Sequence, residues 1–527
     1  MMNQPGLLQK RNRPCKFQFI ALFKTFPLGG SFAPAALKEN DKSQFTHRLS
    51  KGTRTGAFLR LTKIFQNALH PLPRAGICDM LTKKSEEGFL MFRLTTDFTK
   101  NKGPMRPVHG IGNAPVLGWA NDVLMHYLGE AGIPYSRLHD MGGCFGGNRF
   151  VDIPNIFRDF DADPEDPDAY DFTFTDWLLN QLHDQGVDII YRLGVTIENA
   201  IDMKMYRIFP PKDFKKWAVI CEHIIRHYNE GWANGYHLNI LRWEIWNEPE
   251  NDPDLSRNHM WQGTKEQYFE LYRITANHLK ACFPHLKIGG YASCGFYTIG
   301  EDGKYDPNYP RPRYHYFYEF FHDFMKYITA EETKAPLDFF SWHHYQNHTT
   351  VARYACYIRQ QLDAYGFPEA ESILDEWSPG PETRDTPLDA PLIGAVLASL
   401  QDAPIDIANF YDGRAETSYG ALFDPVHVRP FATYYDFVAY NELYKLGTQI
   451  EVSVDCDELI VLGTADSERA AVLLVNPTAQ NAKLTMDKPC EKWVIIDPRR
   501  TYEEVPVPTD GLFRIPGLSV SLFWFKK

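Results

Sequence analysis

Short apolar runs alternate with longer amphipathic stretches through residues 104–440. Each run has the length of a strand, and the stretches between the runs repeat their apolar residues with helical spacing. The stretch 264–283 opens with Thr264 and Gln267 at the spacing of a capping box, and 176–186 ends in glycine. Eight strand and helix units over roughly 330 residues predict an α/β fold, a (β/α)8 TIM barrel with long insertions. The eight runs are 107–112, 133–140, 187–195, 241–250, 286–293, 337–345, 372–380 and 405–413.

The pattern changes in the last part of the chain. Residues 441–527 alternate apolar and polar positions with a period of two, separated by turn residues, and contain no stretch of helical length. This pattern predicts a C-terminal antiparallel β-sandwich as an accessory domain. The strand-like stretch 89–98 is expected to pair with this sandwich, and the catalytic barrel is expected to occupy 91–440.

Residues 1–90 differ from the rest in charge and pattern. Within 1–85 there are 15 Lys and Arg but only three acids, and no helical or strand period is sustained. The apolar run 17–23 behind several basic residues is one feature of a secretory signal, but Lys24 interrupts the place for a cleavage site. We expect a disordered or non-native basic extension, with the folded protein beginning near Met91.

Composition narrows the class of protein. A net charge of −12 argues against nucleic acid and anionic membranes as partners. The 11 Trp, 28 Tyr and 36 Phe suffice for a large core and would also stack on sugar faces. Nine cysteines without a CxxC pair indicate reduced thiols in the cytoplasm. No apolar run approaches ~18 residues, so no membrane span is expected.

Candidate chemistry lies where the barrel strands end, because barrel enzymes carry their active sites at the carboxyl ends of the strands. The fourth run, "LRWEIWNEPE", ends with Glu248, and the seventh, "SILDEWSPG", carries Glu376. These two carboxylates should face each other across the barrel mouth. Such a pair is what glycoside hydrolysis requires, because one acid protonates the leaving oxygen while the other attacks the anomeric carbon or activates water.

Several stretches together resemble clan A glycoside hydrolases, and most closely family 39, which contains β-xylosidases and α-L-iduronidases. The stretches are "EIWNEPE", "LDEWSPG", "RLH" at 137–139, "FFSWHHY" at 339–345, and "WQGTKEQYFELY" followed by "LKIGGYAS". The likeness covers residues 100–527 and includes the accessory sandwich. The sequence departs from the family at Asp375, where threonine is commoner, although "DEW" occurs in arabinofuranosidase families.

The resemblance implies a role for each matching residue. Glu248 would be the general acid/base, Glu376 the nucleophile, and Asn247 the partner of the sugar 2-hydroxyl. Tyr411 stands where many members place a tryptophan under the sugar, and Trp377 is a candidate aromatic wall. The remaining side chains expected to line the sugar site and tune the nucleophile are Arg137, His139, His343 and Tyr345.

The resemblance implies a retaining, exo-acting glycoside hydrolase that uses no cofactor and no metal. Alternatives are an inactive carbohydrate-binding barrel, an arabinofuranosidase or uronidase of clan A, and a metal-dependent hydrolase. The last would use His343 and His344 and would need a His-x-His on the first strand, where only His109 occurs. Glu244 lies deeper on the strand of Glu248 and is expected to pair with an arginine.

The expected substrate is a small glycoside, with a neutral pentoside preferred. A uronic acid would require a cationic clamp, for which Arg192 and Arg414 are candidates unless nearby acids neutralise them. A retaining mechanism predicts carboxyl groups ~5–5.5 Å apart. It also predicts an ionised Glu376 and a raised pKa for Glu248. A homo-oligomer is compatible with the resemblance, because family members often self-associate.

Overall fold

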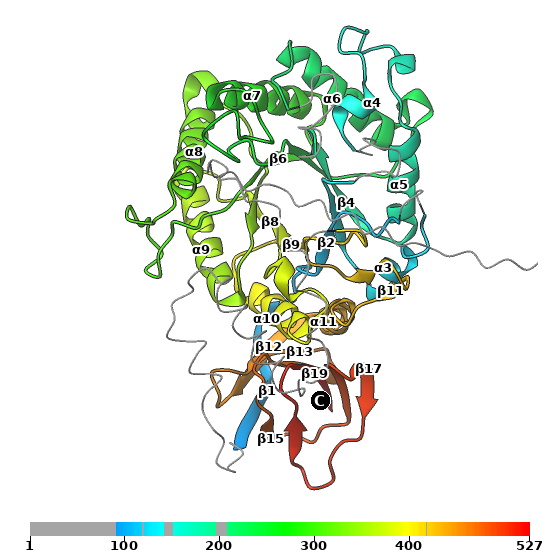
Figure 1. Cartoon of the computed structure of the whole chain (residues 1–527), viewed down its shortest axis with the longest axis vertical. Helices are drawn as coiled ribbons and strands as arrows, with labels where there is room; N and C mark the ends of the chain where they lie inside the picture. The colour runs from blue at the N-terminus through cyan, green and yellow to red at the C-terminus, as the bar shows by residue number, and fades with distance from the viewer. Residues whose placement is uncertain (1–90, 118–120, 142–150, 197–207, 418) are drawn as a thin grey trace, which may run out of the picture. The chain divides into compact units, whose positions relative to one another are not determined.

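The computed structural model describes residues 91–117, 121–141, 151–196, 208–417 and 419–527. The expected basic extension, 1–90, lies outside the described residues. Eight parallel strands follow one another in chain order around a closed barrel (Figure 1), so the predicted TIM barrel is confirmed. They are β2 (Gly110–Gly112), β3 (Tyr135–Leu138), β4 (Asp188–Leu193), β5 (Arg242–Ile245), β6 (Lys287–Ser293), β7 (Phe339–His344), β8 (Glu371–Trp377) and β9 (Ile407–Phe410).

Helices surround the barrel strands on the outside (Figure 1). The predicted capping box opens α7, where the Thr264 hydroxyl accepts from the Gln267 backbone N–H at 3.2 Å and the Gln267 side chain accepts from the Thr264 N–H at 2.9 Å. The helices are α3 (His126–Ala131), α4 (Ile153–Ile156), α5 (Thr173–Asp184), α6 (Phe214–Glu230), α7 (Lys265–Cys282), α8 (Pro312–Thr329), α9 (His348–Ala364), α10 (Asp389–Asp402) and α11 (Tyr434–Leu446). Among the described residues, no helix is both long and apolar enough to cross a membrane.

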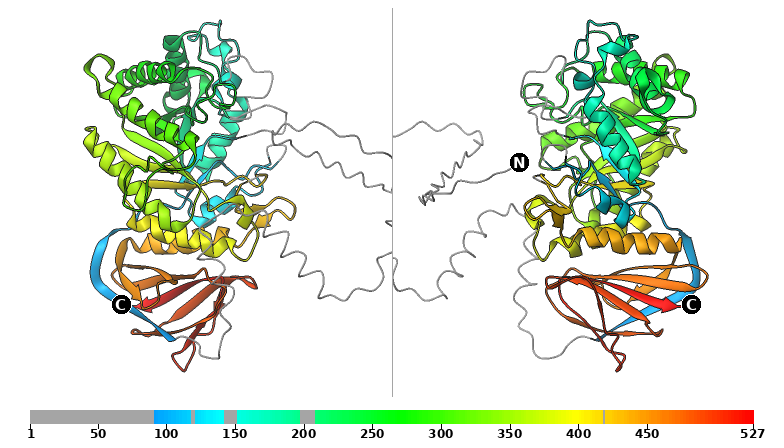
Figure 2. Two further views of the ribbon diagram at one scale, coloured as in Figure 1. Left: turned by 60° about the vertical axis from the view of Figure 1, so that its left-hand side comes forward. Right: turned by 90° about the vertical axis from the view of Figure 1, so that its right-hand side faces the viewer.

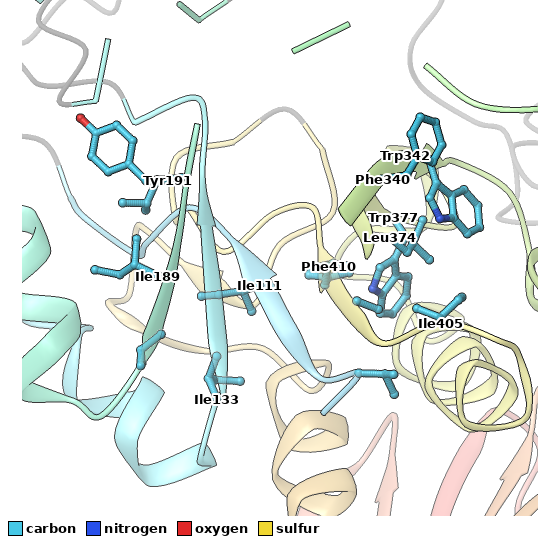
Figure 3. Packing of buried hydrophobic residues seen from close by; sticks show 14 of the residues in the cluster. Ile111, Ile133, Ile189, Tyr191, Phe340, Trp342, Leu374, Trp377, Ile405 and Phe410 are labelled. Atoms are coloured by element: carbon cyan, nitrogen blue, oxygen red, sulfur yellow. The ribbon is translucent and has the colours of Figure 1, made fainter. Parts of the chain in front are cut away.

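The two faces of the barrel strands carry different side chains, because successive residues of a strand point to opposite sides. One face forms a small buried cluster of Ile190, Phe339, Ile373 and Ile407. The other face packs in the main core, where Figure 3 shows Trp377 beside Leu374 and Trp342. Charged side chains stand at both ends of the strands: Arg242, Lys287 and Glu371 form ion pairs at the amino ends, and the candidate site lies at the carboxyl ends.

A second sheet contains nine strands, ordered β17-β16-β19-β14-β13-β12-β1-β15-β18, and curls around its own buried cluster (Figure 2). All its pairs are antiparallel except β1 with β15. The predicted accessory domain of antiparallel strands is confirmed. The strands are β1 (Met91–Pro104), β12 (Thr448–Val454), β13 (Ile460–Ala465), β14 (Arg469–Asn476), β15 (Ala482–Met486), β16 (Lys492–Asp497), β17 (Arg500–Val505), β18 (Phe513–Ile515) and β19 (Ser519–Lys526).

The first described strand belongs to this second sheet. Leu94 of β1 lies opposite Val454 of β12, and Phe92 lies opposite Leu484 of β15. The sheet is therefore built from both ends of the described chain. The domain boundary at residue 440 stays a prediction. A short hairpin, β10 (Phe423–Asp424) with β11 (Arg429–Pro430), lies between the barrel strands and α11.

Candidate active site

The two predicted carboxylates meet at the barrel mouth. Glu376 lies on β8 and is 5% exposed, and Glu248 follows the end of β5 with a side chain 17% exposed. One oxygen of each carboxylate and one ring nitrogen of His343 all lie within 4.8 Å of one another. The sequence spacing had placed these two acids on facing strands, and the fold brings them together.

Two donors hold the Glu376 carboxylate. Arg137 of β3 donates from Nη1 to Oε1 at 2.7 Å, and the Tyr345 hydroxyl donates to Oε2 at 2.5 Å. The same arginine donates to Glu244 at 2.8 Å and to the Asn247 side-chain oxygen at 2.7 Å. Glu244 is thus the arginine partner that the sequence predicted, and Arg137 fixes several acceptors beneath the mouth.

An irregularity in β8 explains which of its side chains enter the site. Trp342 pairs with Leu374 but His343 pairs with Glu376, so β8 carries one extra residue at this point. Such a bulge redirects side chains. Asp375 and Glu376 both face Arg137, whose Nη2 lies 3.2 Å from Asp375 Oδ2.

Trp377 points away from the site. Its ring is fully buried in the main core, 5.2 Å from the ring of Phe410 (Figure 3). The expectation that Trp377 forms an aromatic wall for the sugar is therefore wrong. Because successive strand residues point to opposite faces, Trp377 does not share the face of its neighbour Glu376.

Glu248 is held from two sides at the end of β5. His343 Nδ1 lies 2.8 Å from Oε1, and Asn251 donates from Nδ2 to Oε2 at 2.6 Å. The backbone turns sharply here, because Trp246 and Glu248 both have positive φ, at 74° and 44°. Non-glycine residues rarely adopt this conformation, and it is concentrated at functional sites. Asn251 had no sequence signal of its own and was missed.

The pKa values of Glu376 and Glu248 are shifted in directions opposite to those expected from the sequence. Burial raises the pKa of Glu376 to about 7, against the opposing charges of His343 and Arg137. Burial alone would raise the pKa of Glu248, but His343 and Asn251 outweigh it and the pKa is lowered. Burial alone would lower the pKa of His343, but the Glu376 and Asp375 carboxylates raise it well above its usual value. These opposite directions favour His343 over Glu248 as the holder of the proton in the hydrogen bond between them.

His139 and Tyr411 belong to a neighbouring polar cluster. His139 Nε2 lies 3.0 Å from Asp140 Oδ1, and the Tyr411 hydroxyl donates to Asp140 Oδ2. The Tyr411 ring lies 6.3 Å from the Tyr345 ring, so this cluster borders the one around Glu376. Burial lowers the pKa of His139 to about 4 against the pull of Asp140, so its imidazole is neutral.

The two candidate clamps for a uronic acid already have anionic partners. Arg192 Nη2 lies 2.7 Å from Asp152, and both side chains are fully buried. Arg414 Nη2 lies 2.8 Å from Asp412. Neither guanidinium offers a free positive charge to a sugar carboxylate.

Of the histidines considered as metal ligands in the sequence, His343 lies in a group of described residues that could hold a cation, whereas His344 and His109 do not. His344 Nε2 lies 3.3 Å from the Asn347 carbonyl, and His109 packs 5.0 Å from the ring of Tyr440. Two groups among the described residues have ligand atoms close enough to hold a cation. They are Glu248, His343 and Glu376 at the barrel mouth, and Glu222, His278 and Cys282 on α6 and α7.

A closed (β/α)8 barrel with two carboxylates at its mouth defines a glycoside hydrolase of the clan A type. The family model for glycosyl hydrolases family 39 matches residues 129–414, more than half of the chain, and the chain belongs to this family.

Two β-xylosidases are similar in sequence. That of Geobacillus stearothermophilus is 25% identical over 308 residues, which cover 56% of this chain and 49% of the relative. This chain therefore matches about half of that relative's length. The β-xylosidase of Caldicellulosiruptor saccharolyticus is 23% identical over 388 residues, which cover 66% of this chain and 69% of the relative.

Solved structures share the fold. A glucosidase from Croceicoccus marinus superposes with a TM-score of 0.66 and 20% identity, covering 83% of this chain and 99% of that one. A family 39 β-xylosidase from Caulobacter crescentus gives a TM-score of 0.58 and 17% identity, covering 82% of this chain and all of that one.

Proposed function

We propose that the protein is a retaining, exo-acting glycosidase that releases a terminal neutral sugar, with a β-xyloside as the preferred substrate. Glu376 is the nucleophile and Glu248 the general acid/base. The observation that carries the proposal is the approach of the two carboxylates, whose oxygens lie within 4.8 Å. Retaining enzymes hold their carboxyl groups ~5–5.5 Å apart, whereas inverting enzymes need ~6.5–9.5 Å to fit a water between them.

In the first step a Glu376 oxygen attacks the anomeric carbon as the bond from that carbon to the leaving oxygen breaks. Glu248 gives its proton to the leaving oxygen, and Asn247 holds the sugar 2-hydroxyl. In the second step water attacks the same carbon, Glu248 accepts the proton of the water, and Glu376 leaves as a carboxylate.

The position of His343 supports a route for the proton. His343 Nδ1 lies 2.8 Å from Glu248 Oε1, so the proton can pass to Glu248 along one hydrogen bond. Glycosylation of Glu376 removes the carboxylate charge that contributes most to holding the proton on His343. The second step then begins with less negative charge beside Glu248, which suits its role as base.

Two observations support a neutral sugar over a uronic acid. Arg192 and Arg414 are both neutralised by carboxylates. The two relatives similar in sequence are named as β-xylosidases. A panel of p-nitrophenyl glycosides tests this assignment, and we expect the highest kcat/KM on a neutral pentoside. A clear preference for a uronide or an arabinofuranoside would refute it. Cytoplasmic location and self-association stay predictions.

Two variants test the mechanism. Glu376→Ala should lose about 10³-fold or more in kcat on every substrate. Glu248→Ala should still form the glycosyl-enzyme from activated aryl glycosides, because a good leaving group needs no acid, and azide should rescue its second step with retained configuration. The exposed Glu503→Gln on β17 is the matched control and should behave as wild type.

Other outcomes would favour the alternatives. Azide rescue with inverted product would overturn the assignment of roles. A wild-type protein that binds xylosides but turns over none would be an inactive binding barrel. Loss of activity with chelators, restored by a divalent cation, would favour a metal-dependent hydrolase.

A further inference from the structure

A row of tyrosines and arginines extends from the Glu248 side of the barrel mouth. It is formed by Tyr297, Tyr314, Tyr354, Arg311, Arg313 and Arg353, which we call the arginine rim. These residues come from the segment between β6 and α8, from the start of α8, and from α9. All of them except Tyr354 are at least partly exposed.

The rim begins at the proposed acid/base itself. Arg313 donates from Nε to the Asn251 carbonyl at 2.5 Å, and Asn251 in turn donates to Glu248. Arg313, at one end of the rim, is thus connected through Asn251 to the residue that would protonate the leaving oxygen.

The rings and guanidinium groups form one continuous set. The Tyr297 ring lies 4.6 Å from that of Tyr314 and 6.3 Å from that of Tyr354. Arg311 lies over the Tyr314 ring at 5.4 Å, and Arg353 lies over the Tyr354 ring at 5.1 Å. Stacking on a ring holds a guanidinium flat while leaving its edge free to donate.

None of the rim arginines forms an ion pair within the part of the chain that is described; Arg313 acts on the Glu248 carboxylate only through space and helps to lower its pKa. No described carboxylate oxygen lies within 4.0 Å of a side-chain nitrogen of Arg311, Arg313 or Arg353. The guanidinium groups donate to uncharged oxygens: the Tyr314 hydroxyl, the Asn251 backbone carbonyl and the Tyr354 hydroxyl. The arginines on the other side of the site, Arg192 and Arg414, each have a carboxylate.

The terminal sugar and the leaving group of a substrate would therefore meet different charges. The side that would receive the terminal sugar has its cations paired, whereas the side next to the acid/base has unpaired cations in a chain of net charge −12. Arginine binds carboxylates through two parallel hydrogen bonds. Tyrosine rings offer faces on which a sugar or an aromatic ring can stack.

We propose that the arginine rim is an aglycone subsite for a leaving group that carries a carboxylate. The inference rests on the proposed function, because it needs Glu248 to act on the leaving oxygen. The carboxylate can belong to a uronic acid or to an aromatic acid, since both present a flat face and an anionic edge. The protein would thus take a neutral terminal sugar from an acidic partner.

The test compares two aryl β-xylosides that differ only by a meta-carboxylate or a meta-carboxamide on the leaving ring. In wild type, kcat/KM should favour the carboxylate by about 5–30-fold at low salt, as two or three half-exposed charge pairs would give. The preference should fall to about 1 in R311Q/R313Q/R353Q, and in wild type at about 0.5 M salt, where exposed charges are screened. The exposed Arg93→Gln on β1 is the matched control and should keep the preference.

Two further arms complete the test. Xylosyl-uronic acid and a xyloside of a phenolic acid are compared with their amides, and the larger ratio identifies the source of the carboxylate. Binding of the corresponding non-hydrolysable thioglycosides, measured by calorimetry, should show the same preference. A wild-type ratio near 1 in turnover and binding, or a ratio that survives the triple substitution, would overturn the inference. Absence of turnover with a preserved binding preference would instead count against the proposed function alone.

Discussion

The hydrogen bond from Tyr345 to Glu376 offers the sharpest test of how the nucleophile is tuned. Tyr345→Phe removes the hydroxyl that donates to Oε2 at 2.5 Å and leaves Arg137 Nη1 at 2.7 Å as the other donor. Burial has already raised the pKa of Glu376 to about 7. The carboxylate form therefore depends on its donors, and losing one should raise the pKa further.

The magnitude follows from the kind of bond. A hydrogen bond to a charged group contributes about 1.5–3 kcal/mol. Since 1.36 kcal/mol corresponds to one pKa unit, its loss should raise the pKa of Glu376 by about 1–2 units. Only ionised Glu376 attacks, so the variant should lose about 10- to 100-fold in kcat/KM at pH values below the wild-type pKa. The loss should shrink as the pH rises past the new pKa.

The assay is a pH profile of kcat/KM on an activated aryl xyloside, for which protonation of the leaving group matters little. The acid limb of Tyr345→Phe should move to higher pH. Tyr357→Phe is the matched control, because its hydroxyl bonds His322 at 2.8 Å and touches neither carboxylate, so its profile should coincide with that of wild type. An acid limb that stays in place, or moves to lower pH, would refute the reasoning.

Three further predictions follow from the same structure. Asn251→Ala removes a donor that lowers the pKa of Glu248, so on a xyloside with a poor leaving group the limb of kcat/KM that reports Glu248 should move to higher pH, whereas an unmoved limb would dismiss the role of Asn251. Burial lowers the pKa of His109 from 6.5 to about 3. As the pH falls through this range, the His109 imidazole therefore takes up a proton in the unfolded chain but not in the folded one. The resulting loss of about 4–5 kcal/mol of unfolding free energy by pH 3 should be absent from His109→Gln, and urea titrations at several pH values check it. A chain that starts at Met91 should be soluble and fully active, and an inactive product would move the boundary of the folded protein.

The sequence was sufficient for the barrel because each strand and helix keeps its own period. It was also sufficient for Glu248 and Glu376, because polar residues at the ends of buried strands have few other reasons to be there. It failed for Trp377, which was placed in the site together with its neighbour Glu376 although successive strand residues point to opposite faces. The bulge that brings both Asp375 and Glu376 toward Arg137 was not predicted either. Local pattern does not reveal where a partner strand lacks the matching residue.

The protonation order failed for a related reason. The setting of Glu248 among tryptophans suggested a raised pKa, but His343 from another strand lies 2.8 Å from it and reverses the direction. The arginine rim could not be predicted because it depends on the absence of a partner. Its defining property is that three guanidinium groups form no ion pair with a described carboxylate, and this is known only once the described neighbours are placed.

The place of β1 in the second sheet has a consequence for how the chain is made. β1 lies between β12 and β15, so the first described strand must wait until nearly the whole barrel has been synthesised before its neighbours emerge. Pairing across so long a separation closes slowly, because the loop entropy is lost before any contact is gained. A fragment cut at residue 448 would lack an inner strand and expose the edges of β12 and β15 to other copies. The accessory sheet is therefore the last part of the newly made chain to fold. It cannot be moved to another protein as one contiguous segment, and a fusion that includes it must also include β1.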